Sequence, residues 1–249
     1  MSRAKGFLIT AVTSVFTWIV FYQIGLWYQS DAPVWKASIL IASVIIHEIF
    51  HMIFMEKNGI KAHMFVLVVI GGAYPDKKDR DKMKLLPWSR RAGIVLAGVV
   101  GNVVFVAAAA FAYWAGQISQ TQLSQIANLN GSLILYNMIP FWILDGGQFA
   151  KILFNSSPES QDRKYVATIS MAFLVVIGLL NLCTRQDFIG TTWIVFFCLH
   201  YQARNDDPFG SRNRLAMNET QRFQWSLLYI ALLGIGATLL ATTKPWINP

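Results

Sequence analysis

Residues 45–54 read IIHEIFHMIF, and they lie within an apolar run from about residue 34 to residue 56. On a helix, His47 and His51 are four residues apart and point the same way, so their imidazole nitrogens can bind one metal ion together. Zinc is the ion that this pair predicts, with Glu48 placed to reach a zinc-bound water. A charged group at bilayer depth costs at least ~2.5 kcal/mol, which disfavours the alternative of a polar cluster that binds nothing.

The composition is typical of a membrane protein with several spans. The 249 residues are 55% hydrophobic and only 14% charged, and a soluble domain of this size with so few charges would be poorly soluble. Although the net charge is +8, the Lys and Arg residues lie in short connections between apolar segments, so no nucleic-acid partner is expected. The two cysteines, Cys183 and Cys198, lack C-x-x-C spacing, which argues against a disulfide framework or a thiolate metal site.

Seven apolar segments have roughly the ~20 residues that a transmembrane helix needs. They cover about 7–28, 34–56, 92–115, 123–149, 165–183, 187–203 and 225–243. With the N-terminus in the cytosol, all but three of the 21 Lys and Arg residues fall in the inner connections, the three being Lys36, Arg185 and Lys244. We therefore expect an all-α polytopic protein of about seven transmembrane helices, a single integral domain over residues 1–249, in the plasma or inner membrane of the cell.

The connection after the second apolar segment is unusual. Residues 60–74 are mostly apolar, and their 65–70 core is rich in β-branched residues and precedes a glycine pair at 71–72, which favours a strand over a helix. We expect a short membrane-embedded strand or hairpin between the second and third spans; a surface strand or an interfacial helix is the alternative. The mixed-charge run 75–82 predicts a solvated cytosolic loop near anionic head groups. The polar 203–223 connection is too short for a separate domain.

A catalytic zinc with two histidines needs a further protein ligand, and Asp145 is the acid in apolar surroundings that fits this need. Pro140 and the glycine pair at 146–147 should interrupt the helix around it. By helix rise, His51 lies ~8 Å and Asp145 ~9 Å from the inner ends of their spans, so both lie at one depth toward the cytosol. A structural helix-end role for Asp145 is the alternative.

These motifs together strongly resemble those of the site-2 protease family of intramembrane zinc metalloproteases. The resemblance depends on H-E-x-x-H at 47–51 and N-x-x-P-x-x-x-L-D-G-G at 137–147, with support from the glycine pair at 71–72. Residues 97–102 match an Ala-Gly-Pro-x-x-Asn element of the family except that Val99 replaces the proline, which affects the expected shape of that helix.

The matching core covers roughly 34–154, and 1–33 and 155–249 are expected to be flanking helices without a separate soluble domain. The resemblance implies a zinc metalloendopeptidase that hydrolyses peptide bonds within or near transmembrane segments, in regulated intramembrane proteolysis or in signal-peptide or pro-peptide processing. The implied partners are a substrate with a transmembrane segment, membrane lipids and a regulatory membrane protein. The open edge of a 65–70 strand is expected to bind an unwound substrate as an added strand.

The roles that the resemblance implies are specific. One zinc ion per chain is bound by His47, His51 and Asp145; Glu48 is the general base and then the acid; Asn102 and Asn137 lie near the substrate. For Asn102, interhelical hydrogen bonding is an equally weighted alternative.

Two other classes of protein are disfavoured. A catalytically silent membrane metal-binding or scaffold protein of the same fold would keep the ligands, but the presence of Glu48 argues against it. Membrane di-iron hydroxylases need many more histidines than the four in this chain.

Overall fold

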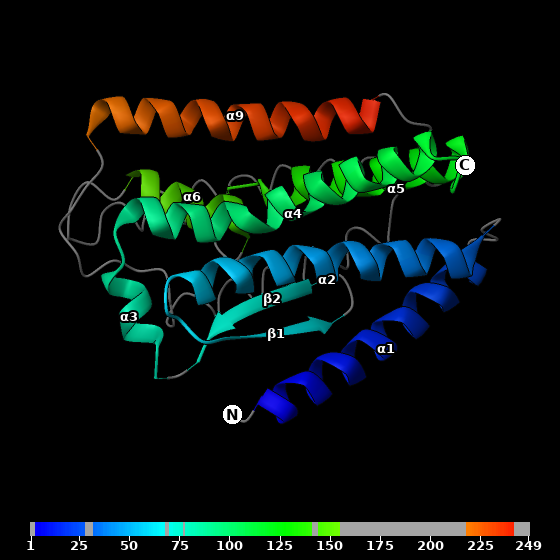
Figure 1. Ribbon diagram of the computed structural model, residues 1–249, viewed down its shortest axis with the longest axis horizontal. Helices are drawn as coiled ribbons and strands as arrows, with labels where there is room; N and C mark the ends of the chain where they lie inside the picture. The colour runs from blue at the N-terminus through cyan, green and yellow to red at the C-terminus, as the bar shows by residue number, and fades with distance from the viewer. Residues whose placement is uncertain are drawn as a thin grey trace, which may run out of the picture. The chain divides into compact units, whose positions relative to one another are not determined.

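The computed structural model describes residues 3–27, 32–67, 70–76, 78–140, 144–154 and 218–241, and over these residues it is mostly helical (Figure 1). The elements in chain order are α1 (Arg3–Trp27), α2 (Pro33–Lys57), β1 (Ala62–Leu67), β2 (Ile70–Pro75), α3 (Arg80–Leu85), α4 (Trp88–Trp114), α5 (Gln120–Asn137), α6 (Asp145–Phe154) and α9 (Glu219–Ala241).

Three of the described helices are long and apolar enough to cross a membrane, which supports a membrane protein. They are α2, α4 and residues Glu219–Leu239 of α9. In α1 the apolar stretch Thr10–Val20 is shorter. The spans expected at 165–183 and 187–203 lie outside the described residues, so the total of seven stays a prediction.

The fourth apolar segment is divided as the sequence predicts. The α5 helix ends at Asn137 and α6 begins at Asp145, with Pro140 between them. Proline has no backbone N–H and clashes with the preceding turn, so a helix cannot continue through it undisturbed. In contrast, α4 runs without a break through Val99, because valine in place of proline keeps the backbone donor.

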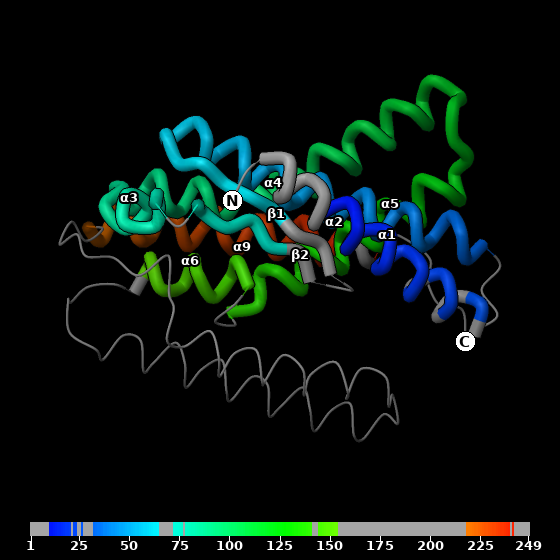
Figure 2. The backbone as a smooth tube through the Cα atoms, turned by 90° about the horizontal axis from the view of Figure 1, so that it is seen from below, coloured from blue at the N-terminus to red at the C-terminus, as the bar shows by residue number. Residues whose placement is uncertain are grey.

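The chain divides into two compact units. The first comprises residues 1–80, 96–135 and 230–249, and the second comprises 81–95 and 136–229. In the first unit, α2 packs against the later part of α4 and against α5, and Figure 2 shows the chain reversing between these two helices. Gly116 in that reversal has φ +72°, a conformation that a residue with a side chain rarely adopts. The buried core of this packing consists of Ile39, Leu40, Val44, Ala109, Ile126, Leu129 and Leu133.

The strand expected after the second span is an antiparallel hairpin of β1 and β2, which packs against α1 and α2 within the first unit (Figure 1). Met64 pairs with Ala73, and the Asp76 N–H donates to the Lys61 carbonyl at 2.7 Å. The Thr10 hydroxyl of α1 donates to the Met64 carbonyl at 2.6 Å. The hairpin is thus confirmed, while its depth in a membrane stays a prediction.

The charged run at 75–82 is a loop only in its first part, because α3 begins at Arg80. The expectation of a loop over the whole run was therefore wrong. Met83 is fully buried, and the burial of this apolar side chain favours a helical turn within the charged residues. Before the helix, Asp79 accepts a hydrogen bond from the Lys61 N–H at 2.9 Å.

In the second unit, aromatic side chains of α6 and α9 pack together. Phe149 is fully buried and stacks on Tyr229, with ring centroids 5.6 Å apart, and it also meets Trp225 at 5.9 Å. The Tyr229 hydroxyl donates to the Met138 carbonyl in the break before α6. This hydrogen bond satisfies the Met138 carbonyl, one of the backbone acceptors that the end of a helix leaves without an intrahelical donor.

Candidate metal centre

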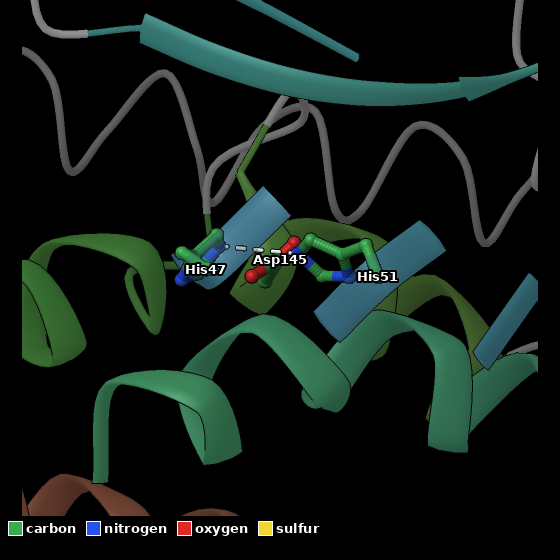
Figure 3. Close-up of side chains that lie close together, drawn as sticks. All are labelled: His47, His51 and Asp145. Carbon is green, nitrogen blue, oxygen red and sulfur yellow. Dashed lines mark hydrogen bonds between the residues drawn. The ribbon is translucent and has the colours of Figure 1, made fainter. Parts of the chain in front are cut away.

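The H-E-x-x-H motif lies in the second half of α2, and its three polar side chains are buried. His47, Glu48 and His51 have 5%, 4% and 6% of their surface exposed, and a charged side chain is seldom fully buried unless it is paired or coordinates a metal. The Nε2 atoms of His47 and His51 face each other at 3.1 Å (Figure 3). The helical spacing therefore brings the two imidazoles together as predicted.

This separation fits two ligands of one zinc ion. With Zn–N bonds of about 2.0–2.1 Å and tetrahedral angles, two nitrogen ligands stand about 3.3 Å apart. The 3.1 Å between the Nε2 atoms is close to that value. The donor set of two imidazoles and a carboxylate is also one that zinc takes in catalytic sites.

Gly98 of α4 makes room for the imidazole pair. A Cβ atom at this position would lie 2.3 Å from the Nε2 of His51 and 2.4 Å from the Nε2 of His47, well inside van der Waals contact. Gly101, one turn further, would place a Cβ 2.9 Å from the Phe50 ring. The two glycines thus allow the α4 backbone to approach α2 at the level of the motif.

The Nδ1 atom of His47 is held by a buried amide. It lies 2.6 Å from Oδ1 of Asn102, a fully buried residue of α4. The Asn102 Nδ2 donates to Oδ1 of Asn130 on α5 at 2.8 Å and to the Ser43 carbonyl on α2 at 3.3 Å. A hydrogen bond at the second nitrogen of a metal-binding histidine orients the ring.

Asp145 is the first residue of α6, where the chain resumes a helix after the break. The next residue, Gly146, lies against the backbone before the break: a Cβ on it would be 2.3 Å from the Met138 carbonyl oxygen and 2.5 Å from that of Ile139. Only a residue without a side chain lets the helix begin so close to the preceding backbone.

Figure 3 draws His47, His51 and Asp145 close together. One ligand atom from each lies within 4.8 Å of the others, so the three form a group that could hold a metal ion. Among the described residues, it is the one set of three His, Cys, Asp or Glu side chains whose ligand atoms lie this close together.

Comparisons with known proteins give a family model for part of the chain and a similar solved fold. The model of Peptidase family M50 matches residues 106–177, a segment that includes Asn137 and Asp145. Among solved structures, the chain is similar to the Site-2 Protease from Methanocaldococcus jannaschii, with 19% sequence identity, a TM-score of 0.56, and coverage of 77% of this chain and 87% of that chain. At this identity the likeness shows a shared fold. No match was found among curated proteins.

The predicted resemblance to the site-2 protease family is confirmed.

The other residues singled out through the site-2 protease resemblance have defined positions. Glu48 is buried on α2 beside His47. Asn102 makes the interhelical hydrogen bonds of the alternative interpretation, directly to a motif histidine. Asn137 is the partly buried last residue of α5. Contact of the two asparagines with a substrate stays a prediction.

Two residues near the site-2 protease motif were not identified from the sequence. Asn130 is fully buried and bonds to Asn102, and Gly98 faces the imidazoles. A signal for Asn130 was available, since it is a polar residue within the apolar 123–149 segment. Gly98 lies inside the 97–102 element, but its contact with the histidines depends on how α4 packs on α2.

Proposed function

We propose that this chain is an intramembrane zinc metalloendopeptidase that cleaves peptide bonds within or near transmembrane segments of other proteins. The observation that carries the proposal is the group of His47, His51 and Asp145, whose ligand atoms lie within 4.8 Å of one another. The match to Peptidase family M50 supports a protease, and the three helices long enough to cross a bilayer support a membrane setting.

The two histidines and Asp145 would bind the metal, and Glu48 would move the proton. Zinc in such a site supplies a water ligand of pKa ~7 and polarises the scissile carbonyl. The buried Glu48 carboxylate accepts a proton as general base and then donates it to the leaving amine nitrogen. The burial of Glu48 and of both imidazoles limits competition from bulk water.

The β2 strand is the proposed docking edge for an unwound substrate. Met64 pairs with Ala73, and because the Met64 carbonyl accepts from Thr10 of α1, it points away from β2. In an antiparallel pair, residues opposite each other point their backbone groups the same way, inward or outward. Ala73 therefore directs its N–H and carbonyl away from β1. Pro75 agrees with this parity, since proline lacks an N–H for the ladder.

This edge refines the hypothesis that a substrate adds to the 65–70 strand. The outer side of β1 is engaged at Met64 by α1, so an added strand would pair with β2. A substrate in extended form exposes its peptide bonds, which a helix shields.

The setting follows from the sequence. We place the N-terminus in the cytosol and the metal centre toward the cytosolic side of the plasma or inner membrane, by the distribution of Lys and Arg. The partners would be a substrate with a transmembrane segment, surrounding lipids and a regulatory membrane protein.

The variant Glu48→Gln tests the enzymatic function, with Glu56→Gln as a control because Glu56 is an exposed acid on the same helix. Glu48→Gln should keep one zinc per chain and lose cleavage by about 10²–10⁴-fold, the usual contribution of a general base. Zinc content and cleavage of a membrane-spanning test substrate are measured on both variants. The same inactive form, purified from its native membrane, should retain the substrate.

A catalytically silent scaffold of the same fold predicts another result. The wild type would then bind zinc and cleave none of the proteins that copurify with the Glu48→Gln form. Equal cleavage by Glu48→Gln and wild type would refute the mechanism itself.

A further inference from the structure

A continuous set of buried hydrogen bonds joins α5 to the first motif histidine. Asn130 Nδ2 donates to the Ile126 carbonyl at 2.9 Å and to the Ser43 hydroxyl at 3.0 Å. Asn130 Oδ1 accepts from Asn102 Nδ2 at 2.8 Å, and Asn102 Oδ1 lies 2.6 Å from His47 Nδ1. We name the set formed by the Ile126 carbonyl, Asn130, Asn102 and His47 the amide relay.

The relay has one consistent direction, because a backbone carbonyl accepts hydrogen bonds and never donates them. The Ile126 carbonyl requires the NH₂ group of Asn130 on its side, so the oxygen of Asn130 faces Asn102. That oxygen in turn requires the NH₂ group of Asn102, which the Ser43 carbonyl also requires at 3.3 Å. The Asn102 oxygen therefore faces His47, and it needs a donor.

His47 can supply that donor in one way only, with a hydrogen on Nδ1. In a neutral imidazole, a hydrogen on Nδ1 leaves the lone pair on Nε2. The Nε2 of His47 is the nitrogen that faces Nε2 of His51 at 3.1 Å. The relay thus directs the lone pair of His47 to the side where a metal would bind.

We propose that Asn130 is a positioning residue that sets the tautomer of His47 through Asn102. Both asparagines and Ser43 are fully shielded, with 0% of their surface exposed, so bulk water does not compete for their hydrogen bonds. The relay acts on the metal ligand of the proposed function and in that respect rests on it. Asn130 acts on His47 through Asn102, which lies between them in the relay.

The tautomer is measured without any metal. Nitrogen-15 NMR of the full chain, labelled at histidine and stripped of metal in detergent, distinguishes protonated from unprotonated ring nitrogens. The chain has four histidines, and the His47 signals are those lost in His47→Gln. The wild type should carry its proton on Nδ1. A wild-type His47 protonated on Nε2 would overturn the proposal outright.

Substitutions then assign the effect to Asn130. Asn130→Leu removes the acceptor at 2.8 Å from Asn102 Nδ2 and leaves only the longer 3.3 Å bond to the Ser43 carbonyl to orient this amide. It should therefore give a mixture of His47 tautomers and weaken zinc binding by about 10-fold or more, as is usual for partners of metal ligands. Asn130→Asp keeps an acceptor toward Asn102 and should retain the wild-type tautomer and bind zinc more tightly than Asn130→Leu. Asn128→Leu is the control, because Asn128 is buried two residues earlier on α5, and residues i and i+2 of a helix do not face the same side.

The outcomes separate this proposal from the proposed function. If Asn130→Leu has the wild-type tautomer and zinc affinity, Asn130 is not a positioning residue, whatever the enzyme does. If the wild type binds no zinc, the proposed function fails, while the tautomers of the wild type and of Asn130→Leu still test the relay. If Asn130→Leu does not fold, Asn130→Asp decides together with the wild type, and a His47 tautomer in Asn130→Asp that differs from the wild type would contradict the proposal.

Discussion

At the scale of single residues, Gly98 is the position where the smallest change should have the largest effect. A methyl group there would stand 2.3 Å and 2.4 Å from the Nε2 atoms of His51 and His47. Rigid aromatic rings on a packed helix cannot yield by that amount without leaving their rotamers. The imidazole pair and the α4 backbone would therefore separate.

We predict that Gly98→Ala loses zinc binding, with a decrease in affinity of at least ~10²-fold because both nitrogen ligands move. Metal content and zinc titration of the purified variant measure this. Gly234→Ala on α9 is a matched control, since a Cβ there meets nothing within 4 Å. Zinc affinity equal to that of the wild type in Gly98→Ala would mean that the two rings do not lie against this glycine.

The sequence predicts the residues of the site better than their surroundings. The four-residue spacing of His47 and His51 is a property of any helix, so it predicts their common direction before the fold is known. Asn130 and Gly98 act through contacts that arise only when particular faces of α2, α4 and α5 meet. No local pattern in the sequence specifies which faces these are.

At the scale of elements, the hairpin gives a prediction about substrate binding. Ala73 directs its N–H away from β1, so a proline at this position removes a donor from the outer edge and leaves the ladder intact. We expect Ala73→Pro to bind zinc as the wild type does and to cleave the membrane-spanning substrate more slowly, by ~10-fold if one substrate hydrogen bond of about 1.4 kcal/mol is lost.

Ala73→Ser is the control for this experiment, because it retains the backbone N–H. Zinc content and the rate of cleavage are compared for the two variants. Equal cleavage by Ala73→Pro and Ala73→Ser would exclude strand addition at β2.

Element boundaries were predicted where the sequence has strong local signals. Pro140 and the glycines after Asp145 indicate the break between α5 and α6. The β-branched 65–70 core indicates a strand in this region but not its bounds, since β1 ends at Leu67 and β2 begins at Ile70. The start of α3 at Arg80 was missed, because the buried contact of Met83 outweighs the polarity of its neighbours and is not visible in a charged run.

At the scale of the whole molecule, the distribution of Lys and Arg predicts which connections face the cytosol. Asp81 in α3 and Gln117 between α4 and α5 are both exposed, and they belong to connections on opposite sides in the predicted topology. The test is to replace Asp81 or Gln117 with cysteine in a variant in which Cys183 and Cys198 have been changed to serine. In right-side-out vesicles, a membrane-impermeant thiol reagent should label Gln117→Cys and not Asp81→Cys. The reverse pattern would invert the topology and place the metal centre toward the outside.

The central claim is that two imidazoles of α2 and the carboxylate at the start of α6 bind one zinc ion. The most direct measurement is X-ray absorption at the zinc edge, with metal content, on the full chain and on Asp145→Asn. The account predicts one zinc per wild-type chain with two imidazole ligands and a carboxylate at about 2.0–2.2 Å. In Asp145→Asn it predicts that the carboxylate ligand is lost and that affinity falls by at least ~10-fold. The same ligand shell and the same affinity in both proteins would contradict it.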